Sequence, residues 1–520
     1  MLVTKNAAEF CTLLVDEIYG ELPSRIFSAL VTKGRSSLAQ LVHHTALTPR
    51  QLRHGLAVLL QHNLLFFYVD ATAKTAFYEA NADHAYNLIR TGKILEMVET
   101  SFGPPAKDVM QNLLSLGQTR ISDLTVAYQA KINQRVRLAL EKDSAAHGED
   151  GPNGVNGTFS QVVKGLDLPV KSSSELNSVL CRLVEADLVE VVHSKTFQTM
   201  DDTLYEVEKE VTALFPGGVK GTKGKMDFDE KVAARLAAIR EESKTLKRKL
   251  ESDGMCRPSA PKRRKLFNGV GAGPGGVQGD GIHENHKEEP DITLDPSQVV
   301  RVNYERCNVD LRNRRLVQFA MDMYGETTAK QGFVRHCGTQ EWTVDFEHLL
   351  HQLKEAELDS IIEQTCGRFG LRLVHILRSK GKLDEKTLHN LGLMKKPDVQ
   401  RKMLEMEVHG FVHVQEVPKD SKHDVKKSIF LWFCDVEKTL GLLLQNTYKT
   451  MLRCMQTLAL LQQRDQDVLM LTKRSNVKGR EQDVMRKEYF DRYSMFLTKE
   501  RRLLAQVHRL DELVGVLRDY

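Results

Sequence analysis

The sequence predicts a mainly α-helical protein with small β-wings (α+β), in which tandem extended winged-helix domains are followed by a C-terminal helical hairpin or coiled coil. Three observations predict this class. Three helices and a β-hairpin, the order that defines the winged-helix form of the helix-turn-helix, occur within the first 80 residues. The same order returns far downstream, and residues 435–520 carry a helical apolar stripe. A chain of 520 residues is also long enough for several domains.

The first predicted winged helix spans residues 1–82. Apolar periodicity predicts three helices in it, over 8–19, 22–32 and 37–45. Thr48 is a good N-cap for a further helix, Pro49 suits the first helical position, and Gln51 completes a capping box. That helix carries a core stripe of four leucines, Leu52, Leu56, Leu59 and Leu60. The wing is then predicted to consist of two strands, 64–69 and 75–80.

A second copy of this pattern predicts a winged helix over 359–434. Its elements are expected to be helices at 371–379 and 384–391, a helix from Pro397 to Gly410, and strands at 411–417 and 428–433. The distance from the first helix-ending glycine to the proline at the helix start is 15 residues in one copy (Gly34 to Pro49) and 16 in the other (Gly381 to Pro397). This match indicates an internal repeat.

Two less regular copies are predicted between them. The second winged helix, 83–215, has a flexible insertion near 141–171, a strand at 187–192 and a possible closing wing strand at 204–207; its helices are expected at 94–102, 107–116, 120–132 and 172–186. The third, 298–358, is shortened to a helix at 311–324 and a wing made from 332–334 and 342–346. Because there is no room for two helices between Glu326 and Gln331, either this module has lost its recognition helix or the gene model lacks a segment.

Residues 216–297 are predicted to form a basic, glycine-rich linker, flexible around 269–281. After the last winged helix, 435–520 predicts two long amphipathic helices with a polar break near 475–479. Burying the apolar stripe of such a hairpin requires either a partner or the chain's own modules, so the hairpin is the expected docking element.

Composition excludes several classes of protein. The net charge is only +5 with 28% charged residues, which excludes a wholly disordered chain and a histone-like polycation. No apolar run approaches the roughly 18 residues needed to span a bilayer, and we expect no secretory signal. Eight cysteines without a CxxC pattern suggest reduced thiols in a nuclear or cytosolic protein. The basicity is local, because residues 220–266 contain 15 Lys/Arg against 7 Asp/Glu.

The module order resembles the winged-helix subunit of RNA polymerase III, the largest member of that enzyme's initiation heterotrimer. Short segments carry the resemblance: residues 56–64 of the first module, Arg368-Phe369-Gly370, and residues 411–419 of the last. The resemblance implies a non-catalytic subunit that sits with two smaller heterotrimer partners on the polymerase clamp. It also implies four extended winged helices, so the short third module departs from the family.

Two helix faces are candidate DNA-binding surfaces. Arg50, Arg53 and His54 lie opposite the leucine stripe of the first module, where arginine can hold phosphate or read guanine. A solvated face or a protein-docking face is the alternative. In the last module Arg401 and Lys402 share their face with carboxylates, which favours protein docking there.

Two basic clusters match a bipartite nuclear-localisation signal and predict a nuclear location; they are Lys247-Arg248-Lys249 and Lys262-Arg263-Arg264-Lys265. A phosphate-binding tail is a compatible alternative. No enzyme motif is complete in the sequence. Residues 217–225 have the wrong spacing for a phosphate loop, and neither of the two HxxH pairs has a cysteine or carboxylate nearby at the spacing of a metal site. We therefore expect no catalytic residues, no cofactor and no metal.

The predicted function is that of a non-catalytic RNA polymerase III subunit supporting initiation at small untranslated RNA genes. Its expected partners are other polymerase III subunits, including the clamp and two heterotrimer partners, initiation factors, and single- or double-stranded promoter DNA held largely without sequence preference; no membrane is expected. The alternative is a sequence-specific winged-helix regulator that acts as a free dimer through the hairpin.

Overall fold

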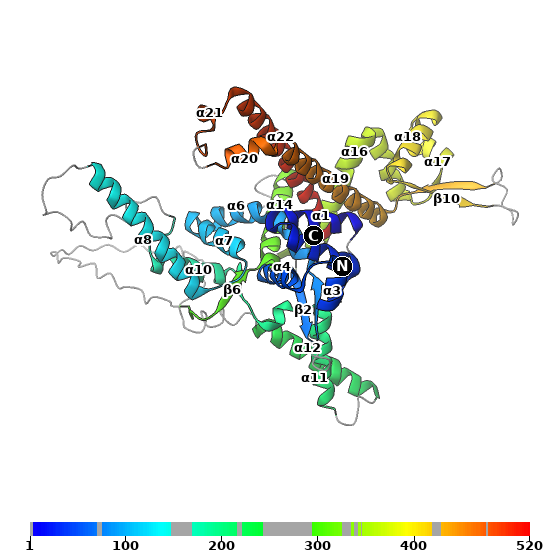
Figure 1. Ribbon diagram of the computed structural model, residues 1–520. Coiled ribbons are helices and arrows are strands. Elements are labelled where there is room, and N and C mark those ends of the chain that lie inside the picture. The colour runs from blue at the N-terminus through cyan, green and yellow to red at the C-terminus, as the bar shows by residue number, and fades with distance from the viewer. Residues whose placement is uncertain are drawn as a thin grey trace, which may run out of the picture.

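The computed structural model describes residues 4–69, 75–146, 169–215, 221–242, 294–324, 334–336, 342–344, 346–418, 428–474 and 477–520. The chain is mainly helical with small antiparallel sheets, which confirms the predicted fold class. The first winged helix lies near the centre, with the last winged helix to the right and the long helix of the second module to the left (Figure 1). The terminal hairpin runs above the first winged helix, and its far end points up and to the left. No described helix is long and apolar enough to cross a membrane.

The helices and the two-stranded wing predicted for the first module are present, and a short additional strand joins the wing. Its elements are α1 (Lys5–Tyr19), α2 (Glu21–Lys33), β1 (Ser36–Ser37), α3 (Leu38–Thr45), α4 (Pro49–Gln61), β2 (Leu65–Val69) and β3 (Ala76–Ala80). The strand order is β1-β3-β2, and all pairs are antiparallel. The predicted capping box is present: Thr48 Oγ1 accepts from the Gln51 N–H at 3.3 Å, and Gln51 Oε1 accepts from the Thr48 N–H at 3.0 Å. These bonds fix where α4 begins and therefore which of its faces is buried.

The second winged helix departs from the prediction at its wing. It contains α6 (Thr91–Phe102), α7 (Pro104–Leu116), β4 (Thr119–Arg120), α8 (Ile121–Ala146), α10 (Ser173–Glu185) and β5 (Val189–Val191). The closing strand is β6 (Val299–Val302), which pairs with both β4 and β5. The strand predicted at 204–207 is wrong, because Leu204, Val207 and Val211 follow a helical spacing and lie in α11 (Met200–Ala213).

The predicted linker 216–297 is partly structured. Its residues from Gly221 to Glu242 form α12, which packs against α11 through Val207, Val211 and Val232. The two helices are thus an insertion within the wing of the second module, between β5 and β6 (Figure 1). The glycine-rich stretch and both basic clusters lie outside the described residues.

The third and fourth modules follow β6. The third provides α14 (Tyr304–Tyr324) and a hairpin of β7 (Val334–His336) and β8 (Trp342–Val344). Only nine residues, 325–333, separate α14 from β7, too few for two helices. The fourth contains α16 (Phe346–Lys380), interrupted at Gly367, then β9 (Leu383–Asp384), α17 (Glu385–Gly392), α18 (Lys396–Val408), β10 (His413–Val417) and β11 (Ile429–Phe433). The helices predicted at 311–324, 371–379, 384–391 and 397–410 and the hairpin of the fourth module are present, but α14 begins earlier, and the helical segment 346–366 and the strand β9 were not predicted.

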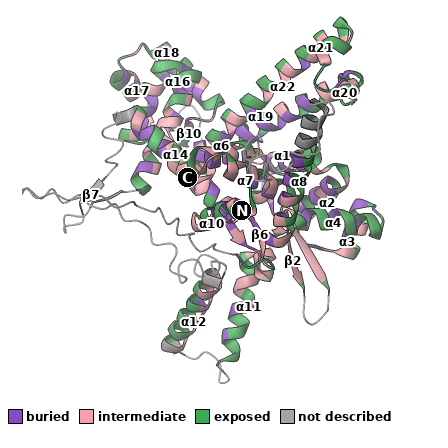
Figure 2. Ribbon diagram, turned by 90° about the vertical axis from the view of Figure 1, so that its left-hand side faces the viewer, coloured by how far each residue is buried: buried purple, intermediate pink, exposed green. Residues whose placement is uncertain are grey.

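The C-terminal region forms the predicted helical hairpin, with additional short segments. It consists of α19 (Val436–Arg464), α20 (Gln466–Thr472), α21 (Glu481–Val484), α22 (Lys487–Val514) and a π-helical turn η3 (Gly515–Asp519). The stripe of α19 is buried against α1, in one core with Tyr448, Met451 and Leu452. The base of the hairpin is therefore covered by the first winged helix, whereas the far end around α20 and α21 is largely exposed (Figure 2).

Candidate nucleic-acid and partner interfaces

Helix α4 presents the basic face predicted for the first module. Its leucines Leu52, Leu56 and Leu59 are buried, and Gly55 lies so close to α2 that an added Cβ would be 2.4 Å from Ile26 Cδ1. Packing on this side leaves the predicted site residues on the opposite side, and Arg50, Arg53 and His54 are all exposed. None of the three makes an ion pair with a described residue. The face therefore has uncompensated positive charge.

The wing of the same module is less accessible. Arg35 forms an ion pair with Asp202 of α11 at 2.8 Å, and its guanidinium lies 5.0 Å from the centre of the Tyr68 ring. Phe67 of β2 meets Phe197 at 5.6 Å between ring centres. The second module therefore covers part of the described wing.

Helix α18 has a different surface chemistry. Arg401 is paired with Asp398 at 2.9 Å and Lys402 with Glu405 at 2.7 Å. The hydrogen bond from Lys402 holds the pKa of the Glu405 carboxyl below its usual range, and the nearby Lys402 charge adds to this effect. Leu404 is 57% exposed and Val408 85%, on the same face as Arg401. Neutralised charge beside exposed aliphatic side chains suits a protein surface better than phosphate.

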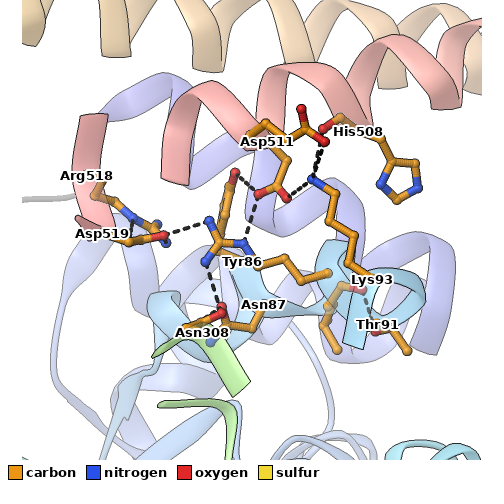
Figure 3. A network of polar contacts seen from close by, with 12 residues as sticks. Tyr86, Asn87, Thr91, Lys93, Asn308, His508, Asp511, Arg518 and Asp519 are labelled. Atoms are coloured by element: carbon orange, nitrogen blue, oxygen red, sulfur yellow. Dashed lines mark hydrogen bonds and ion pairs between the residues drawn. The ribbon is translucent and has the colours of Figure 1, made fainter. Parts of the chain in front are cut away.

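A buried polar network joins four parts of the chain (Figure 3). Asp511 of α22 is its centre: its Oδ1 accepts from the Tyr86 hydroxyl at 2.8 Å and from Arg90 Nε at 2.9 Å, and its Oδ2 accepts from Lys93 Nζ at 2.8 Å. Arg90 also forms an ion pair with Asp519 of η3 at 2.6 Å and donates to Asn308 of α14 at 3.1 Å. The segment that supplies Tyr86 and Arg90 is α5 (Ala82–Asn87) with the 3-10 turn η1 (Leu88–Arg90).

The charges in this network compensate one another despite deep burial. Arg90 is only 4% exposed and Asp511 only 3%. Burial raises the pKa of Asp511, but Arg90 and Lys93 outweigh it and hold that pKa below its usual range. Burial likewise lowers the pKa of Arg90, and the two carboxylates of Asp511 and Asp519 raise it above its usual value. The network thus fixes the hairpin to the connection between the first two modules as charged pairs.

No sequence pattern above singles out Tyr86, Arg90 or Asp511. One signal was nevertheless available, because Asp511 follows Val507 by four residues and precedes Val514 by three. It therefore lies on the apolar stripe of its helix, where a carboxylate needs a buried partner.

The predicted localisation residues, Lys247-Arg248-Lys249 and Lys262-Arg263-Arg264-Lys265, lie outside the described residues. Among the described residues, no group of three or more His, Cys, Asp or Glu side chains is placed to hold a metal ion.

Tandem winged helices, one of them with a free basic helix face, fixed to a helical hairpin define a multi-module nucleic-acid or protein-binding subunit. Three family models match the chain: the RNA polymerase III subunit RPC82 helix-turn-helix domain over residues 9–70, RNA polymerase III subunit RPC82 over 178–330, and the POLR3C C-terminal winged-helix domain over 358–434. The chain belongs to this RPC3 (RPC82) family of RNA polymerase III subunits, which confirms the resemblance. It is a family of accessory subunits and does not include the catalytic one.

Full-length relatives show the same membership. A DNA-directed RNA polymerase III subunit RPC3 from Chaetomium globosum is 43% identical over 647 aligned positions, which cover 91% of this chain and 100% of the relative. A subunit rpc-3 from Neurospora crassa is 41% identical over 655 positions, covering 100% of both chains. That alignment exceeds the 520 residues of this chain by 135 positions, so the relative has segments without a counterpart here.

Proposed function

We propose that this chain supports transcription initiation by RNA polymerase III at small untranslated RNA genes, by contacting promoter DNA and initiation factors and helping to hold the DNA open. Family membership supports placing it in the polymerase beside other subunits, and the proposal includes two heterotrimer partners and the clamp among its neighbours. The observation that carries the DNA contact is the uncompensated basic face of α4, formed by Arg50, Arg53 and His54. The catalytic subunit of the polymerase makes the RNA.

DNA contact by α4 is expected to be mainly to phosphate. Two exposed guanidinium groups on adjacent turns neutralise backbone charge wherever the helix lies, which gives binding without strong sequence preference. In α18 the corresponding cations are already paired with Asp398 and Glu405, so a phosphate would have to displace a carboxylate. We therefore assign DNA to α4 and protein partners to α18.

The test measures the salt dependence of DNA binding. The double variant Arg50→Ala/Arg53→Ala is expected to weaken binding of labelled single- and double-stranded oligonucleotides. It should also reduce the slope of log K against log salt by about 1.4 to 1.8, because each lost phosphate contact contributes about 0.7 on single strands and about 0.9 on duplex. The matched control, Arg401→Ala/Lys402→Ala, should leave the slope unchanged. An unchanged slope in the α4 variant, or an equal loss in the α18 variant, would refute the assignment.

The same variants connect binding to function. In polymerase reassembled with the α4 variant, opening of promoter DNA should decrease while elongation from a pre-formed bubble continues. Opening is measured by the permanganate reactivity of unpaired thymines.

We further propose a nuclear location, with the basic clusters at 247–249 and 262–265 as the localisation signal. Replacing both clusters by alanine should leave a fluorescent fusion in the cytoplasm.

The alternative function, a free dimeric regulator, is less well supported. It required the hairpin stripe to form the dimer interface, but Met451 and Leu452 of α19 are buried against the first winged helix of the same chain. Membership in a family of polymerase subunits also favours a heteromeric assembly.

A further inference from the structure

The far end of the hairpin carries a dense group of unpaired cations. We define the hairpin tip as residues 465–487, from the end of α19 to the start of α22. Within 473–487 the sequence has six basic residues against two acidic ones, Glu481 and Asp483. All six basic residues are exposed, and none forms an ion pair with a described residue; they are Lys473, Arg474, Lys478, Arg480, Arg486 and Lys487.

A groove with a mixed apolar and polar lining begins beside these cations. It is a hollow of about 630 Å³ between α19, α20 and α22, with Glu17 of α1 at its other end. Leu469, Tyr493 and Leu497 form apolar parts of its lining, and Gln462, Gln463 and Gln466 form polar parts. Met470 also lines it and is 56% exposed, a flexible apolar side chain of the kind that adapts to different partners. This surface has no partner among the described parts of the chain.

The groove is held open by a local ion-pair network. Arg492 of α22 binds Asp465 at 3.0 Å and Asp467 at 3.1 Å, and so ties the start of α20 to α22. Phe496 is buried below it, which fixes the spacing of the two helices from inside. A groove whose walls are set in advance costs little ordering free energy when a partner binds.

Charge is distributed unevenly along the groove. Lys473 lies at the tip end, whereas Glu17 and Glu500 line the end near the first winged helix. Burial raises the pKa of Glu500, and the nearby Glu17 carboxylate raises it further, in keeping with two acidic groups in one confined place. A ligand in the groove therefore meets positive charge at the tip and negative charge toward α1.

We propose that the hairpin tip binds an acidic amphipathic segment of another polypeptide of the polymerase assembly, with its apolar side chains in the groove and its carboxylates on the tip cations. The partner is a polypeptide because phosphate alone would leave the exposed apolar lining uncovered, and nucleic acid would face the carboxylates of Glu17 and Glu500. The inference rests on the proposed place of the chain in the polymerase, and adds the chemistry of one partner.

The test uses polymerase reassembled with the full chain carrying the photocrosslinker p-benzoylphenylalanine at Met470. We expect a crosslink to an acidic stretch of another subunit or factor, identified by mass spectrometry. The variant Lys478→Glu/Arg480→Glu should reduce its yield at least tenfold. The same crosslinker at Val126, which is 69% exposed on α8, is the position control and should not reach that stretch. A 20-residue amphipathic helical peptide, with Glu side chains on one face and Leu side chains on the other, should compete for the site. A 20-nucleotide single strand should not.

The outcomes separate this inference from the proposed function. If the chain assembles and supports promoter opening but Met470 yields no crosslink, or a crosslink that charge reversal does not reduce, the tip proposal is wrong and the function stands. Crosslinking to DNA, competition by the oligonucleotide, or crosslinking to a second copy of this chain would also overturn it. If the chain does not assemble with polymerase at all, the proposed function itself fails.

Discussion

The buried network around Asp511 makes a sharp prediction for the variant Asp511→Asn. The substitution keeps the shape and one acceptor oxygen but removes the charge that compensates Arg90 and Lys93. Loss of one partner of a buried ion pair costs about 3–5 kcal/mol. Arg90 retains Asp519 at 2.6 Å, and Lys93, which is partly exposed, retains Glu512 at 3.8 Å, so we expect the lower limit of about 3 kcal/mol.

Hydrogen exchange can measure this loss where it occurs. Opening of the last turns of α22 and η3 breaks the network without unfolding the other modules, and exchange of those amides reports that local free energy. A loss of about 3 kcal/mol corresponds to a decrease in protection of about 100-fold, since each factor of ten is about 1.4 kcal/mol. The decrease should extend to α5 and η1, because Tyr86 and Arg90 lose the same carboxylate.

The control is Asp467→Asn, which removes a carboxylate from an exposed ion pair with Arg492 at the other end of the same hairpin. Protection of residues 508–519 should be unchanged in that variant. If Asp511→Asn leaves this protection within threefold of the original chain, the network does not hold the hairpin, and the reasoning above is wrong.

Two further predictions concern the connections between modules. Burial lowers the pKa of His84 to about 3, so the folded chain holds the imidazole neutral while the unfolded chain takes up a proton below about pH 6.5. Stability should therefore fall as the pH decreases from about 6.5 toward 3, and thermal melting of His84→Gln should show a weaker pH dependence; equal dependence would contradict this. Gly117 has a φ of +79°, and an added Cβ would lie 2.3 Å from the Gln61 carbonyl oxygen, so Gly117→Ala should cost about 1–3 kcal/mol in urea unfolding. Gly92→Ala, in open space within a helix, should cost nothing; equal midpoints for the two variants would refute the strain argument.

Local signals in the sequence were sufficient for the first and last winged helices. Thr48 and Gln51 cap α4 through bonds to residues three positions away, and Asp384 caps α17 in the same way. Contacts of this range are encoded within a few residues, so a single sequence reveals them. The apolar stripes then determine which faces are buried and which, like that of Arg50 and Arg53, remain exposed.

Long-range pairing was beyond reach of the same reasoning. In the wing of the second module Val191 pairs with Val300. Because 107 residues separate β5 from β6, no local sequence pattern indicates that pairing. A four-residue stretch at 204–207 is too short to separate a strand from a helix by period, and its continuation to Val211 decides for the helix. Arg90 and Asp511 are 421 positions apart, so only the fold brings them together.

The C-terminal turn contributes to the small core formed by the described helices of the third module. Its core contains only a few buried side chains from α14 and α16, among them Leu316, Leu349 and Leu353, and Val516 of η3 completes it. Two residues later, the Arg518 guanidinium lies 4.2 Å from the centre of the Tyr86 ring, beside the Asp511 network. One short segment thus fills the third module and fixes the hairpin to the first two. The η3 turn therefore adds buried apolar contact to the third module at the place where it also helps to hold the hairpin.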